Sequence, residues 1–88
     1  MKRSQNFLMR TVAGKQVIVP VGKAATAFPG MITVNGVGAY IWQLLEQEQT
    51  LDALVDALES KYEADRQTIL ADTQSFLEKL RSTGAIEE

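Results

Sequence analysis

The order of apolar and polar residues predicts strands in the first third of the chain and helices in the rest. Two runs rich in β-forming residues, 7–12 and 16–20, are separated by Ala13-Gly14-Lys15, a connection short enough for a hairpin. Gly14 can supply the positive φ that such a turn requires. A third β-forming run covers residues 31–34. We therefore expect a sheet of three antiparallel strands.

The stretch between the second and third strands, residues 21–29, is predicted to be a loop. It contains Gly22 and several alanines, and Phe28 would pin it to the body of the domain. Pro20 has no amide hydrogen to donate, so it either ends the second strand or lies at an edge of the sheet.

Three amphipathic helices are predicted after the strands. They open at Asn35, Thr50 and Asp65, which are all favoured N-cap residues, and the last helix stops at Gly84. Two glycines, at positions 36 and 38, lie in the first turn of the first helix, where glycine costs about 1 kcal/mol relative to alanine. We expect a close backbone approach to explain them. The apolar stripe of this helix consists of Val37, Tyr40, Ile41, Leu44 and Leu45.

The apolar face of the third helix is wider than one core-facing stripe requires. Its members are Ile69, Leu70, Thr73, Phe76, Leu77 and Leu80. Two interpretations stay open: the whole face belongs to the core, or part of it is left over for a ligand.

Composition restricts the classes of function. A chain of 88 residues suffices for one domain and one core, but not for a core and a deep active-site cavity. Cysteine and histidine are both absent, which removes disulfides, thiolate nucleophiles, the usual zinc ligands and the usual general base. Gly36-Val37-Gly38 follows a strand, but Ile41 stands where a dinucleotide-binding fingerprint needs its third glycine. We predict a non-catalytic chain without metal or cofactor.

Hydropathy predicts a soluble protein. No apolar run approaches the roughly 20 residues of a membrane helix. The first five residues lead into a strand rather than into the apolar core of a signal peptide. The lack of cysteine fits a reducing compartment. We therefore expect a cytoplasmic protein without membrane association.

The net charge of −2 conceals a division of charge along the chain. All 11 acidic residues lie at position 46 or later. The charges either form ordinary solvated surfaces or steer an acidic peptide toward the strands. The basic residues of the first half are Lys2, Arg3, Arg10, Lys15 and Lys23.

The segment 30–45 combines a short strand, an Asn cap, glycines and an aromatic-rich helix, and in this it resembles the PqqD family. These are small peptide-binding proteins named for pyrroloquinoline quinone (PQQ) biosynthesis. The segments 7–10, 17–20, 51–55 and 76–80 extend the resemblance over nearly the whole chain.

The resemblance implies an α+β, winged-helix-like fold in which a three-stranded antiparallel sheet is followed by a three-helix bundle, as a single domain over residues 1–88. It also implies a non-catalytic recognition module or peptide chaperone. Such a module binds the leader of a ribosomally synthesised precursor peptide by strand addition and presents it to a modifying enzyme, commonly a radical S-adenosylmethionine (SAM) enzyme.

The same resemblance implies where the leader lies: along the edge of the third strand and against the third helix. A free strand edge beside an apolar groove is a physically suitable site for an extended peptide. The implied peptide-binding residues are Met31, Ile32, Thr33, Val34, Ile69, Asp72, Thr73, Phe76, Lys79 and Leu80.

A winged-helix nucleic-acid-binding protein is the alternative. The third helix would then enter a groove of DNA, yet it carries acids as well as bases, so we expect no nucleic-acid partner. Its charged residues are Arg66, Asp72, Glu78, Lys79 and Arg81. The sequence leaves open whether the pathway makes a quinone cofactor, a lasso peptide or another product. It also leaves open a homodimer formed by strand exchange at the free edge.

Overall fold

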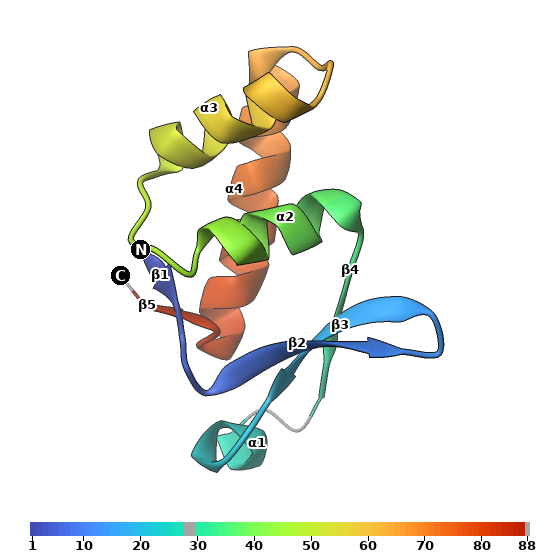
Figure 1. Cartoon of the computed structure of the whole chain (residues 1–88). Helices are drawn as coiled ribbons and strands as arrows, with labels where there is room; N and C mark the ends of the chain where they lie inside the picture. The colour runs from blue at the N-terminus through green and yellow to red at the C-terminus, as the bar shows by residue number, and fades with distance from the viewer. Residues whose placement is uncertain (28–29, 88) are drawn as a thin grey trace.

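The computed structural model describes residues 1–27 and 30–87. A sheet with the strand order β2-β3-β4 stands beside the helices α2, α3 and α4 (Figure 1). The predicted α+β class and the three-stranded antiparallel sheet are confirmed. In chain order the elements are β1 (Lys2–Arg3), β2 (Phe7–Val12), β3 (Lys15–Pro20), α1 (Lys23–Ala27), β4 (Ile32–Val34), α2 (Gly36–Leu44), α3 (Leu51–Lys61), α4 (Arg66–Thr83) and β5 (Ile86–Glu87).

The hairpin between β2 and β3 turns at two residues. Ala13 and Gly14 both have positive φ, of 52° and 79°, as the tight hairpin turns require. Val12 is paired with Lys15, so Lys15 belongs to the strand rather than to the turn. The predicted hairpin and the positive φ at Gly14 are confirmed.

Two parts of the fold differ from the sequence prediction. The segment predicted as a loop contains the short helix α1, which contacts β3. The expected pinning role of Phe28 lies outside the described residues. In addition, β1 and β5 pair antiparallel, Lys2 with Glu87 and Arg3 with Ile86, so that the two ends of the described chain lie side by side (Figure 1).

The register of the sheet decides which side chains enter the core. Met9 lies opposite Ile18, and Ile18 opposite Ile32, so these three side chains share one face. Ile18 and Ile32 are buried in the core cluster. Thr33 follows Ile32 and therefore points to the opposite face, where it is exposed.

Two helix starts are capped as predicted. The Asn35 side chain accepts a hydrogen bond of 2.8 Å from the Gly38 amide, and the Thr50 hydroxyl accepts one of 3.1 Å from the Ala53 amide. Because Asn35 directly follows β4, the strand passes into α2 without a loop. This junction fixes the position of the first turn of α2 relative to the edge of the sheet.

The longest helix, α4, is also capped at both ends as predicted. Asp65 accepts a 2.8 Å hydrogen bond from the Thr68 amide and a 3.0 Å bond from the Thr68 hydroxyl. These bonds hold the pKa of the Asp65 carboxyl below its ordinary value. At the other end Gly84 adopts the left-handed conformation, with φ of 84°.

The core lies between the inner face of the sheet and the three long helices. Trp42 is its largest fully buried side chain, at 2% exposure. Among the residues that the structure describes, no helix combines the length and the hydropathy of a bilayer-spanning segment.

Candidate functional site

The strand β4 lies at an edge of the sheet. Its residues pair with β3 only, Val34 with Gln16 and Ile32 with Ile18, and no described strand lies along its other side. An edge strand exposes main-chain N–H and C=O groups to which a further strand can add. The edge that the sequence analysis proposed for strand addition is therefore present, over three residues.

The first turn of α2 lies between β4 and α4 and closely approaches both. A Cβ atom built on Gly38 would lie 3.2 Å from Cβ of Val34 and 3.3 Å from two ring carbons of Phe76. A side chain here would force these neighbours to shift by a few tenths of an ångström, so glycine suits the close approach, as predicted for Gly38. The same prediction is wrong for Gly36, because nothing described lies within 4 Å of a Cβ at that position.

Two apolar clefts follow one another along α4. One lies between α2 and α4 and has a volume of about 300 Å³, and the other lies between α3 and α4 with about 290 Å³. Both are lined by Val37 and Asp72, so they adjoin, and we call them together the α4 groove. The first cleft is lined by Asn35, Val37, Gly38, Ile41, Asp72 and Phe76, and the second by Val37, Leu58, Tyr62, Glu63, Ala64, Thr68, Ile69, Asp72 and Thr73.

The chemistry of the α4 groove is that of an apolar trough with two acidic side chains, Glu63 and Asp72. The Thr73 side chain is 1% exposed, and its hydroxyl has no hydrogen-bond partner among the described residues. Within the described chain, no group of three or more acidic side chains could hold a metal ion. Such a trough can bury apolar side chains of a peptide, and the neighbouring strand edge can bind the peptide main chain.

The structure brings four of the sequence-predicted residues into the α4 groove: Ile69, Asp72, Thr73 and Phe76. Phe76 is half-buried and Asp72 is exposed, so both offer surface to a ligand. Ile69, at 7% exposure, and Thr73 form the floor.

The other predicted residues lie outside the lining of the groove. Met31, at 56% exposure, and Thr33 are exposed beside or on β4, and Lys79 is exposed on α4. Ile32 and Val34 direct their side chains into the core. We therefore limit their role in the site to main-chain groups.

Leu80 needs a correction. Its side chain is fully enclosed, at 0% exposure, and belongs to the core cluster. A ligand on α4 would not reach it in this conformation, so we remove Leu80 from the contact surface and assign it to the support of the helix.

Sequence reasoning missed the walls that α2 and α3 contribute. Val37 and Ile41 line the first cleft, and Tyr62 lines the second. Val37 and Ile41 belong to the apolar stripe predicted for the first helix, and Tyr62 is the C-cap residue of α3. An apolar stripe gives the same signal whether it meets the core or borders a groove.

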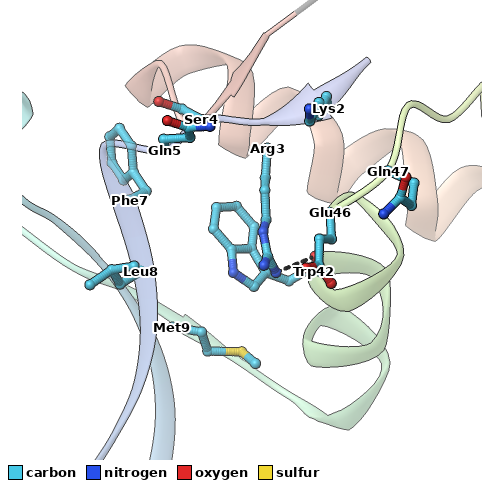
Figure 2. Close-up of a pocket in the computed structure, with 10 residues that line it drawn as sticks. All are labelled: Lys2, Arg3, Ser4, Gln5, Phe7, Leu8, Met9, Trp42, Glu46 and Gln47. Atoms are coloured by element: carbon cyan, nitrogen blue, oxygen red, sulfur yellow. Dashed lines mark hydrogen bonds between the residues drawn. The ribbon is translucent and has the colours of Figure 1, made fainter.

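A larger cavity, of about 630 Å³, lies away from the α4 groove. Figure 2 shows it between the N-terminal residues, the beginning of β2 and the C-terminal end of α2. None of the predicted peptide-binding residues lines it.

Comparison with known proteins gives two matches. The family model described as "Coenzyme PQQ synthesis protein D (PqqD)" matches residues 15–86. The solved structure "TbiB1 in Complex with the TbiA(beta) Leader Peptide" is similar to this chain with a TM-score of 0.77 and 26% sequence identity, over 99% of this chain and 95% of that chain. No curated protein matches the chain. The family match includes β4, α2, α3 and α4, which together form the strand edge and the α4 groove.

Proposed function

The chain belongs to the PqqD family, and on that premise we propose that it is a non-catalytic recognition module for the leader segment of a ribosomally synthesised precursor peptide. One observation carries the proposal: the free edge of β4 adjoins an apolar groove, in a chain whose structural relative was solved with a leader peptide. The module would hold the leader and so present the rest of the precursor to a modifying enzyme.

Strand addition is the binding mode that this arrangement supports. An extended leader would form main-chain hydrogen bonds with the edge of β4, in which Ile32, Thr33 and Val34 take part through backbone groups. Alternate side chains of a strand point to the same face, about 7 Å apart. Every second leader side chain would then face the α4 groove, where Phe76 and Ile69 offer apolar surface.

The exposed members of the predicted set would border the bound leader. Met31 offers apolar surface at the start of β4, and Asp72 lies where the two clefts meet. Lys79 is exposed one helical turn beyond Phe76, where it would meet an acidic leader residue.

The partner enzyme and the location follow from the same proposal. We expect a radical SAM enzyme or another peptide-modifying enzyme, working in the cytoplasm where the precursor is synthesised; PQQ biosynthesis is one such pathway. The neighbouring reading frames test this, because a short peptide gene beside a gene for a modifying enzyme would identify both partners. A homodimer formed by strand exchange would occupy the β4 edge, so leader and dimer would compete.

Nucleic-acid binding gains no support from the comparisons. Arg66, one of the few bases on α4, is bound to Asp56 and Glu59 at 2.8 Å each. It is therefore held by acids of α3 rather than free for phosphate.

Titration calorimetry with the cognate leader, the product of the neighbouring short reading frame, tests the proposal. We expect a Kd that is micromolar or tighter, about 8 kcal/mol of binding free energy. Thr33→Pro and Val34→Pro each delete one amide of β4. Because successive amides point to opposite sides of a strand, only one variant should lose the leader while staying folded.

The proposal fails if both proline variants stay folded and bind the leader with the affinity of the parent chain. Circular dichroism of each variant, recorded before the titration, establishes which of them are folded.

A further inference from the structure

The strand β2 is the second edge of the sheet, and it borders the 630 Å³ cavity. Phe7, Leu8 and Met9 of β2 line this cavity in succession, opposite Trp42 and the residues that precede β2. The strand order places β2 at the other end of the sheet from β4. We call the cavity and the adjoining edge of β2 the β2 surface.

The cavity is lined in part by apolar side chains, and Arg3 is held within it by several contacts. Figure 2 shows Met9 and Trp42 on one side of β2 and Leu8 pointing away on the other. The guanidinium of Arg3 lies over the Trp42 ring, 5.6 Å from its centroid, and donates a 3.1 Å hydrogen bond to the Trp42 carbonyl. The Arg3 amide donates to the Leu45 carbonyl at 2.9 Å. Arg3 is thus fixed at the C-terminal end of α2.

The charges on the β2 surface favour an acidic occupant. Lys2 and Arg3 line the cavity together with Glu46, and Arg10 is exposed further along β2, on the face that Leu8 shares. No acidic residue precedes position 46. The side-chain hydrogen bond that Arg3 makes to the Trp42 carbonyl uses one of the five N–H groups of its guanidinium, whose planar fork suits a carboxylate.

A leader bound at β4 would leave this surface accessible, because β3 separates the two edges. A module that presents a peptide to an enzyme needs two surfaces that can be occupied at the same time. This step rests on the proposed function.

We propose that the β2 surface docks an extended acidic segment of the modifying enzyme. The segment adds as a strand to the edge of β2, and alternate side chains enter the cavity between Met9, Trp42 and Arg3. Apolar side chains of the segment contact Met9 on the cavity side. The carboxylates between them point to the opposite face of the sheet, where Arg10 lies, and Lys2 and Arg3 at the cavity add to the attraction. The leader and the enzyme segment then flank the same sheet.

A synthetic peptide of alternating glutamate and leucine, with a lysine–leucine peptide of equal length as control, probes this surface. Titration into the ¹⁵N-labelled chain should shift the amide signals of residues 8–12 and the indole signal of Trp42. We expect the acidic peptide to bind about tenfold more tightly than the basic one, with an affinity that falls as salt increases.

A charge-reversed double variant, Lys2→Glu with Arg10→Glu, should lower the affinity for the acidic peptide about tenfold. Both side chains are exposed, so the variant should stay folded, with a small fall in melting temperature because the new carboxylate at position 2 lies opposite Glu87. The matched control, Lys23→Glu with Lys61→Glu, makes the same charge change at exposed positions on α1 and α3 and should keep acidic-peptide binding. With the purified modifying enzyme, the first variant should weaken enzyme binding by a similar factor and leave leader affinity unchanged.

Several results would overturn the proposal: no shifts with the acidic peptide, shifts at β4 and α4 instead, or equal weakening by the two double variants. Shifts at β2 that depend on protein concentration without peptide would assign the surface to a second copy of the chain, which also contradicts it. Leader titration of the parent chain, run in parallel, tests the proposed function separately, because its failure leaves the result at β2 unaffected.

Discussion

The backbone of Gly38 lies against the ring of Phe76. A Cβ at position 38 would lie 3.3 Å from both Cε1 and Cζ of the ring, closer than such atoms usually approach. Phe76 is half-buried, and both residues line the cleft between α2 and α4. The missing side chain of Gly38 therefore determines how deeply the ring sits, and so the shape of the α4 groove.

Gly38→Ala should destabilise the chain. The added methyl group forces the Phe76 ring or Val34 to move, and overpacking of this kind costs about 1 to 3 kcal/mol. The higher helix propensity of alanine returns at most about 1 kcal/mol. Urea denaturation measures the net loss, and leader affinity should fall because the displaced ring narrows the cleft.

Gly36→Ala is the matched control, since a Cβ there meets nothing within 4 Å among the described residues. It should leave stability unchanged or raise it by up to about 1 kcal/mol. A Gly38→Ala variant as stable as Gly36→Ala would contradict the close contact.

Phe76→Ala should weaken leader binding by about 1 to 3 kcal/mol if the ring anchors the peptide. The neighbouring residue gives a control: Leu77 is 1% exposed in the core, and Leu77→Ala should instead cost about 2 to 5 kcal/mol of folding free energy. Calorimetry measures the first effect and denaturant unfolding the second. Unchanged leader affinity in a folded Phe76→Ala variant would remove the α4 groove from the binding site.

Asp65→Asn should reduce stability at neutral pH but not in acid. The folded chain lowers the pKa of Asp65 below its ordinary value of 3.8, chiefly through the hydrogen bond from the Thr68 amide. The charged carboxylate therefore stabilises the fold above that value, and its contribution disappears as the pH falls through the lower, folded-state pKa. Melting temperatures measured from neutral pH down into the acid transition should converge for the two proteins.

Thr50→Ala provides the uncharged comparison. The substitution removes the Thr50 hydroxyl, which caps α3 by accepting a hydrogen bond from the Ala53 amide. It should lower the free energy of unfolding by about 1 kcal/mol. Its effect should stay nearly constant over the same pH range, since no proton is exchanged. If the difference in melting temperature between the parent chain and Asp65→Asn stays the same down into acid, the charge of Asp65 contributes nothing to the cap.

Duplex DNA should bind weakly at low salt and be released near physiological ionic strength, because α4 offers few bases and Arg66 is already paired with two acids. Fluorescence anisotropy of a labelled duplex measures this. Sequence-specific retention at physiological salt, abolished by combined substitution of Arg66, Lys79 and Arg81, would restore the nucleic-acid alternative.

The sequence alone determined the features that depend on near neighbours. A cap at Asn35, Thr50 or Asp65 is one hydrogen bond to an amide three residues away, and the β2–β3 hairpin is closed by two residues. Such interactions join residues only a few positions apart, so the local sequence is enough to predict them. The strand edge and four residues of the α4 groove could be predicted only with the help of the resemblance to a family.

Tertiary structure decided everything that depends on distant partners. The pairing of β1 with β5 joins segments more than 80 residues apart, and two-residue strands carry no periodicity to reveal them. The full burial of Leu80 and the half-burial of Phe76 could not be told apart by pattern, because both residues belong to the same apolar face of α4. Whether an apolar side chain becomes core or groove wall depends on which elements pack over it, and that is fixed only when the sheet and the helices meet.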